Sequence, residues 1–182
     1  MPIPPFISSL RAKVGTDLLW LTGVTAVVLD DEGRVLLGQR ADSGRWALIS
    51  GILEPGEEPA VAMVREIKEE TGVDAVVDAL AAIQVQHPMT YPNGDRAQYL
   101  DLLFLAHATD GEPHPADDES LAVGWFSLDD LPENTGHYTQ ERLAAVAAYQ
   151  ANPAAGPQLA GAAGAGKAAP DPRPTPPAPA ET

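Results

Sequence analysis

Three glutamates between residues 66 and 70 carry the clearest chemical signal in the sequence. Glu66, Glu69 and Glu70 are spaced i, i+3 and i+4, so in a helix their carboxylates share one face with Cβ atoms about 5–6 Å apart. Like charges at this spacing destabilise a bare helix, whereas a hard divalent cation removes the repulsion and prefers oxygen ligands. Taken alone, such a cluster is more often a solvated acidic face than a metal site.

A helix must position these glutamates, and the sequence predicts it from Glu58 to Thr71. Pro59 suits the first turn of a helix, and Gly72 suits the position just past its end. Apolar residues with the spacing of one buried stripe are Ala60, Met63, Val64, Ile67 and Thr71. The three carboxylates are therefore expected on the opposite face of the helix.

Arg65 stands within the acidic cluster and has two candidate partners. It can pair with Glu69 one turn further along the helix, or it can reach back to the loop before the helix. That loop contains two more carboxylates, Glu54 and Glu57. The sequence leaves both pairings open.

The cluster belongs to a longer pattern in residues 51–73, GILEPGEEPAVAMVREIKEETGV. Its defined positions are filled by Gly51, Glu57, Arg65, Glu66, Ile67, Glu69, Glu70, Gly72 and Val73. This segment resembles the Nudix box, and the chain is identified as a MutT-like member of the Nudix hydrolase family. Further resemblance in LLGQRADSGRW, a downstream hairpin and DDESLAVGWFSLDDLP extends it over about residues 22–132. One departure is Ile49-Ser50, where many members carry Pro-Gly.

The resemblance implies a metal site. Glu66, Glu69 and Glu70 would bind Mg²⁺ or Mn²⁺, with the carbonyl oxygen of Gly51 as a further ligand. Glu119 lies in an acidic loop and matches a second acidic position, which serves as a metal ligand or as a base. A solvated loop acid is the alternative for Glu119.

The resemblance also implies roles in holding the site together and in catalysis. Glu57 and Arg65 would hold the loop against the helix, and Arg65 counts with Glu66, Glu69 and Glu119 as a catalytic residue. A carboxylate near a metal-bound water can take its proton. The sequence leaves open which of the three glutamates does so.

These residues predict a Mg²⁺- or Mn²⁺-dependent pyrophosphohydrolase. Its substrate would be a small molecule in which a nucleoside diphosphate is linked to another group, such as a nucleoside triphosphate or an ADP-ribose-like compound. The alternative from another class is a non-catalytic, nucleotide-sensing module. Such modules usually lose glutamates from the box, and this chain retains them all.

Two residues after the box bear on the substrate within the family. Pro88 matches a proline that suggests ADP-ribose hydrolases, and Tyr91 matches a tyrosine that suggests diadenosine-polyphosphate hydrolases. Both rules are satisfied at once. The two residues therefore do not choose between these substrates.

Three charged residues outside the box are candidates for binding substrate. Arg40 and Arg45 flank the loop before the box and could grip a phosphate or a ribose, although surface arginines are the more ordinary case. Asp101 falls in an apolar strand, where an unpaired carboxylate is costly. It is expected either near the active site or bonded to a neighbour.

The order of the predicted elements indicates an α+β domain with a mixed sheet. Strands are expected at residues 19–29, 35–39, 46–49, 75–86, 97–107 and 121–127, and a last helix at 139–149, capped by Thr139 with Glu141 in its first turn. Asn93-Gly94 between two apolar runs predicts a hairpin. The resemblance implies an α/β/α sandwich around a central mixed sheet.

Composition divides the chain and limits its partners. We expect an N-terminal segment at 1–18, the Nudix domain at 19–152 and a disordered Ala/Pro-rich tail at 153–182. The net charge of −15 argues against a passive grip on long nucleic acid. No apolar run reaches the roughly 20 residues of a membrane helix.

Other expectations rest on weaker signals. The chain has no cysteine, and its N-terminus lacks the apolar stretch of a signal peptide, so a cytoplasmic location is the default. Pro174 to Pro179 could recruit a partner through a polyproline segment, although an inert tail is the simpler interpretation. The sequence leaves open whether the chain forms a homodimer.

Overall fold

A computed structural model describes residues 3–159 of the chain. Its elements are α1 (Pro5–Val14), β1 (Leu19–Leu29), β2 (Val35–Arg40), β3 (Trp46–Ala47), β4 (Ile49–Ile52), α2 (Pro59–Thr71), β5 (Asp74–Val85), β6 (Met89–Thr90), β7 (Arg96–Asp110), β8 (Ser120–Phe126), α3 (His137–Ala151), a 3₁₀ turn (Pro153–Ala155) and β9 (Gln158–Leu159). No helix in this described part is long and apolar enough to span a membrane.

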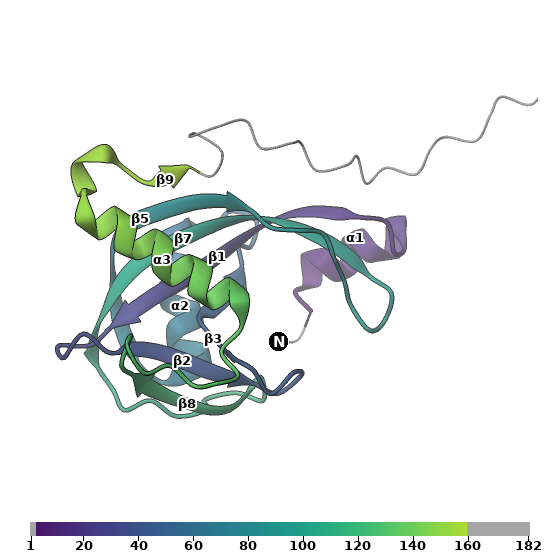
Figure 1. Ribbon diagram of the computed structural model, residues 1–182. Helices are drawn as coiled ribbons and strands as arrows, with labels where there is room; N and C mark the ends of the chain where they lie inside the picture. Colours follow the sequence, from purple (N-terminus) through teal and green to yellow (C-terminus); the bar gives the residue numbers. More distant parts are fainter. Residues whose placement is uncertain (1–2, 160–182) are drawn as a thin grey trace, which may run out of the picture.

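Strand β1 is the centre of a mixed sheet (Figure 1). It runs parallel to β7 over its whole length, from Leu19 beside Ala97 to Leu29 beside His107. It pairs antiparallel with β4 and β2, while β7 pairs antiparallel with β5. Both faces of β1 are covered, so residues 24–28 are buried without alternation, as expected for a strand between two layers.

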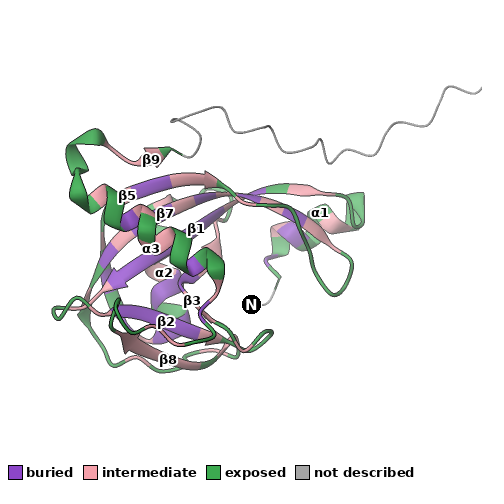
Figure 2. Ribbon diagram, viewed as in Figure 1, coloured by how far each residue is buried: buried purple, intermediate pink, exposed green. Residues whose placement is uncertain are grey.

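Two helices cover the two faces of this sheet. Residues with opposite orientations on β1 belong to two separate hydrophobic clusters, because successive side chains point to opposite faces. Val24, Ala26 and Val28 pack with the apolar side of α2, whereas Val27 packs with Val146 of α3. Figure 2 shows the buried residues concentrated between these layers. The α/β/α sandwich with a mixed sheet is confirmed.

The predicted strand at residues 46–49 is in fact two short strands. Trp46–Ala47 pairs with β2, whereas Ile49–Ile52 pairs with β1. The chain crosses from one neighbour to the other at Leu48, which is buried. Periodicity in so short a segment does not reveal such a change of partner. Ser50, the departure from Pro-Gly, lies within β4 opposite Thr25.

The Asn93-Gly94 turn closes the predicted hairpin. The backbone N–H of Tyr91 donates to the carbonyl oxygen of Asp95 at 2.8 Å, and Gly94 has a φ of +86°, a conformation that glycine adopts without strain. The strands immediately joined are the short β6 and the long β7. Strand β5 then pairs with β7 further from the turn.

The prediction for the last helix is wrong at its start. Thr139 does not cap α3, because the helix begins two residues earlier, after Gly136. The backbone N–H of Gly136 donates to the carbonyl oxygen of Trp46 at 3.2 Å, a tertiary contact that local propensity does not reveal. Thr139 is buried in the first turn, and Glu141 bonds His137 at 3.0 Å.

Both ends of the described chain extend the predicted domain. The segment expected before residue 19 contains α1, which lies beside the end of the sheet (Figure 1). Past the expected boundary at residue 152, β9 pairs with Ala82 and Ile83 of β5. The rest of the predicted tail, residues 160–182 with the segment Pro174 to Pro179, lies outside the described residues.

Candidate active site

The three box glutamates do not all lie on a solvent-exposed face of α2. Glu66 is 4% exposed and Glu70 is 8% exposed, whereas the side chain of Glu69 is 57% exposed. Ala60, predicted to be in the buried stripe, is exposed. The prediction that the acidic face is opposite the buried face is therefore wrong, because Glu66 and Glu70 lie on the side of α2 that also buries Met63 and Ile67.

Gly51 of β4 lies against the carboxyl group of Glu66. A Cβ added at Gly51 would overlap the carboxyl carbon and Oε1 of Glu66. Any larger residue would therefore displace this carboxylate. Because residue 51 has no side chain, the carboxylate of Glu66 lies close to the backbone of β4. The family resemblance implied a metal ligand at this point, the carbonyl oxygen of Gly51.

Arg65 pairs both with Glu69 and with the loop before α2, the two alternatives that the sequence left open. Its Nε and Nη2 donate to the two carboxylate oxygens of Glu57 at 2.8 and 3.1 Å. Its Nη1 donates to Glu66 Oε1 at 3.1 Å and to Glu69 Oε2 at 2.9 Å. Such a fork-to-carboxylate pair fixes orientation as well as charge, so Arg65 connects the loop before α2 to two of its glutamates.

The buried carboxylates form one electrostatic unit. Burial raises the pKa of Glu66 to about 7, opposed by Arg65 and assisted by the charges of Glu69 and Glu119. Burial raises the pKa of Glu70 to about 9, assisted by the charges of Glu119, Glu66 and Asp117. The charge of Glu119 thus acts on both Glu66 and Glu70, although Glu119 is about 50 residues away in the chain.

This donor set suits a divalent cation in its chemistry. Carboxylate oxygens and a backbone carbonyl are the ligands that Mg²⁺ and Mn²⁺ prefer. In residues 3–159, no three Asp, Glu or His side chains converge closely enough to hold a metal ion as they stand. The guanidinium of Arg65 instead lies between Glu66 and Glu69. A positive charge thus already compensates part of the cluster.

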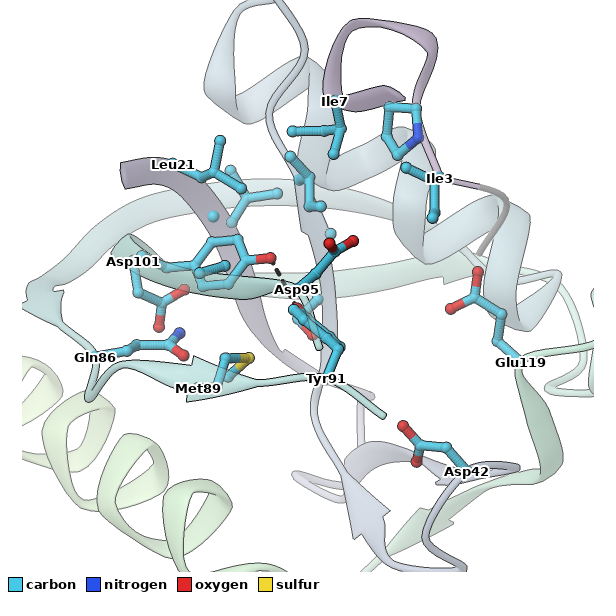
Figure 3. A pocket seen from close by; sticks show the side chains of 18 of the residues that line it. Ile3, Ile7, Leu21, Asp42, Gln86, Met89, Tyr91, Asp95, Asp101 and Glu119 are labelled. Carbon is cyan, nitrogen blue, oxygen red and sulfur yellow. Dashed lines mark hydrogen bonds between the residues drawn. The ribbon is translucent and has the colours of Figure 1, made fainter. Parts of the chain in front are cut away.

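A cavity of about 680 Å³ lies beside this cluster and is lined by Gly51 and Glu119 (Figure 3). Arg40 also lines it, as do residues of α1. Its size lies within the range of small-molecule sites. Arg40 is ion-paired to Asp42 at 2.6 Å, and the charges of Glu70 and Glu119 raise its pKa further.

Arg45 is not brought to this cavity. Its side chain is exposed and does not line the cavity wall. Its backbone carbonyl instead accepts a bond from the N–H of Arg40 at 2.9 Å, which closes the turn between β2 and β3. Of the two candidate arginines, the structure places only Arg40 at the site.

Both alternatives for Asp101 hold at once. It lines the cavity, is 1% exposed, and accepts a hydrogen bond from Thr25 Oγ1 at 2.8 Å. Its other oxygen accepts from Nε and Nη2 of Arg142, at 2.9 and 2.8 Å. Arg142 lies on α3 and was not a candidate from the sequence, because nothing local distinguishes it from a surface arginine.

Replacing Arg142 with Met is expected to destabilise the protein by about 3 kcal/mol, because the buried carboxylate of Asp101 then loses its charge partner. Urea unfolding at neutral pH measures this. The double variant Arg142→Met/Asp101→Asn should lose less than the sum of the two single variants. A loss below about 1 kcal/mol in Arg142→Met would mean that the pair is structurally dispensable.

Comparison with known proteins agrees with this geometry. The NUDIX domain family matches residues 20–146. A MutT-like protein of Streptomyces ambofaciens is 34% identical over 120 residues, which cover 66% of this chain and 72% of that protein. The human 8-oxo-dGDP phosphatase NUDT18 is 34% identical over 115 residues, which cover 60% of this chain but only 33% of that protein. The chain thus spans about a third of that relative.

A solved structure extends the likeness to the fold. The MutT NUDIX hydrolase of Burkholderia pseudomallei superposes with a TM-score of 0.57 at 33% identity, and covers 70% of this chain and 98% of its own. Residues 20–146, which the family matches, include the glycine, the arginine and the glutamates of the acidic cluster, as well as Asp101 and Arg142. From the matched sequence, the shared sandwich and the arrangement of these residues, the chain belongs to the Nudix hydrolase family.

Proposed function

We propose that this protein hydrolyses the phosphoanhydride bond of a nucleoside diphosphate linked to another group, with Mg²⁺ or Mn²⁺ as cofactor. The observation that supports this most strongly is the pair of buried glutamates beside Gly51 and Glu119, two residues that line the cavity. Burial and mutual repulsion raise the pKa values of Glu66 and Glu70. Such a concentration of buried negative charge is costly unless cations balance it. A solvated acidic face, the alternative, would leave these two carboxylates exposed.

We assign the metal to the oxygens of Glu66, Glu69, Glu70 and Glu119 and the carbonyl of Gly51. When bound, the cation would neutralise diphosphate oxygens and acidify the attacking water. Arg65 would orient Glu66 and Glu69, since it already bonds both.

The proton and the phosphate also need partners in the chain. A carboxylate of the cluster would take the proton from the water as it attacks phosphorus and the anhydride bond breaks. Arg40 lines the cavity beside Glu119 and would bind a phosphate of the substrate. To do so, it would exchange its ion pair with Asp42 for the phosphate oxygens.

Two kinds of substrate follow from the relatives. The human relative is named as an 8-oxo-dGDP phosphatase, and a Methanocaldococcus jannaschii relative, 32% identical over 121 residues, is named as an ADP-ribose pyrophosphatase. Both compounds contain a diphosphate joined to a nucleoside. We propose that the catalytic domain is residues 19–152, since these include the family match.

A turnover screen tests the proposal. The purified protein would be incubated with nucleoside di- and triphosphates, their 8-oxo forms, ADP-ribose, dinucleoside polyphosphates and nucleotide sugars, with Mg²⁺ or Mn²⁺. We expect hydrolysis of at least one of these that stops on addition of a chelator. Binding of nucleotide without hydrolysis of any compound would instead support the non-catalytic alternative.

A further inference from the structure

The far end of the cavity, lined by Gln86, Tyr99 and α1, differs in character from the part lined by Gly51, Glu119 and Arg40. This end is lined by apolar side chains from α1, β1 and β4 together with the ring of Tyr99. The apolar residues are Ile3, Ile7, Leu21 and Ile52. Figure 3 shows Ile3 and Ile7 facing Asp101 and Gln86 across the cavity. A surface of this kind fits the flat, weakly polar part of a ligand better than a phosphate or a sugar.

Helix α1 is held in place as a wall of this end. Arg11 donates from Nη2 to the carbonyl oxygen of Arg96 at 2.6 Å and from Nη1 to that of Asp17 at 2.6 Å. Its Nε also lies 3.5 Å from the carboxylate of Asp95. These contacts fix α1 to the turn between β6 and β7. They engage both Nη groups of Arg11, whereas its Nε has no hydrogen-bond partner within residues 3–159.

Helix α1 also lies outside residues 20–146, which match the family. Ile7 is nevertheless buried in a cluster with Leu21 and Tyr99 of the family domain. This wall of the cavity is therefore built by a segment that the family match does not include.

Gln86 is the polar group at this end whose side chain is not engaged. Its backbone N–H donates to the carbonyl oxygen of Tyr99 at 2.9 Å, and its own carbonyl accepts from Nε2 of Gln98 at 3.0 Å. Residues opposite each other on antiparallel strands point to the same face, so Gln86 lies beside Tyr99 and reaches into the cavity (Figure 3). Its side-chain amide forms no hydrogen bond within residues 3–159.

The other polar side chains near Gln86 are already bonded. Both oxygens of Asp101 accept hydrogen bonds, from Thr25 and Arg142. The hydroxyl groups of Tyr91 and Tyr99 bond each other at 2.8 Å. A ligand that reaches this end thus meets one unengaged amide, which offers a donor and an acceptor side by side.

We infer that the far end of the cavity is a nucleobase subsite in which α1 and Tyr99 cover the ring and the amide of Gln86 bonds the base edge. The inference rests on the proposed function, since the substrate must contain a nucleoside. Every nucleobase presents hydrogen-bond donors or acceptors on its edge, and an amide can pair with such an edge through two bonds. Gln86 is thus a specificity residue, separate from the groups that act on the phosphates.

Binding of non-hydrolysable compounds tests this without turnover. The probes are the α,β-methylene diphosphates of adenosine, guanosine, cytidine and uridine, and methylenediphosphonate, which has no base. Calorimetric titrations in Mg²⁺ would compare wild type, Gln86→Met and Gln84→Met. Met keeps the length of Gln86 and removes its amide. Gln84, two residues earlier at the end of β5, does not line the cavity and serves as the matched control.

We expect the tightest nucleoside probe to bind Gln86→Met about tenfold more weakly, as for one or two lost hydrogen bonds. Affinities for the different bases should then become more alike. Methylenediphosphonate should bind all three proteins equally, and Gln84→Met should match wild type.

Three results would overturn the subsite. They are unchanged nucleoside affinity in Gln86→Met, an equal loss for methylenediphosphonate, or wild-type protein that binds nucleosides no better than methylenediphosphonate. None of these depends on hydrolysis. A failed turnover screen with the expected binding pattern would instead contradict the catalytic proposal alone.

Discussion

Glu66→Gln is expected to lower kcat by about a thousandfold and to change KM little, the loss expected when a charged group acts mainly in the transition state. The glutamine occupies the same space beside Gly51, so packing is preserved while the negative charge is removed. The carboxylate lies between the backbone of β4 and Arg65. Steady-state kinetics on the best substrate, with saturating Mg²⁺, measure the effect.

Glu54→Gln is the matched control for this experiment. Glu54 lies in the loop before α2, is exposed, and contributes a backbone N–H to Glu57. Its side chain has no assigned role, so kcat should stay at the wild-type value. Residual activity of Glu66→Gln within tenfold of wild type would remove Glu66 from the catalytic site.

The stability of the metal-free protein is expected to fall as pH rises from about 5 to about 9. In the folded protein the pKa of Glu66 is raised to about 7 and that of Glu70 to about 9. The unfolded chain releases these protons near its ordinary pKa, at a lower pH than the folded chain does. The folded state therefore holds more protons throughout this window, and the free energy of unfolding decreases as pH increases.

Each unit by which these pKa values are raised corresponds to about 1.4 kcal/mol, so the fall amounts to several kcal/mol. Millimolar Mg²⁺ should restore stability most at the alkaline end, where the carboxylates are charged and an ion bound to the native state stabilises it by mass action. Urea unfolding across this pH range, in chelator and in Mg²⁺, measures both effects. Glu70→Gln in chelator should lose most of the pH dependence. A metal-free curve that rises with pH would show that these carboxylates are not strained by burial.

The site could be located from the sequence because its core is local. The box residues lie within 23 consecutive positions, and helical periodicity determines the angles at which three glutamates leave α2. The strand β1 and the turn at Asn93-Gly94 could be predicted for the same reason, since the signals for a buried strand and a tight turn are short-range.

Predictions from local sequence were wrong where a residue's burial or an element's bounds depended on the tertiary contacts of that element. The spacing of Glu66 and Glu70 on α2 says nothing about what packs against them, so their burial was not expected. The single strand predicted at residues 46–49 is two strands in the structure, because each half pairs with a different neighbour. Helix α3 begins before its predicted start, next to Gly136, whose backbone N–H bonds to the carbonyl oxygen of Trp46.

The sequence by itself determined the family, the carboxylate chemistry and the helix that carries it, because these depend on residue types at fixed local spacing. Only the tertiary structure brought Glu119 into the field of Glu70, joined Arg142 to Asp101 across 41 residues, and placed α1 and Gln86 at the far end of the cavity. These arrangements depend on strand pairing and on which helix covers each face of the sheet. Residues distant in the chain meet through that packing, and local spacing does not encode it.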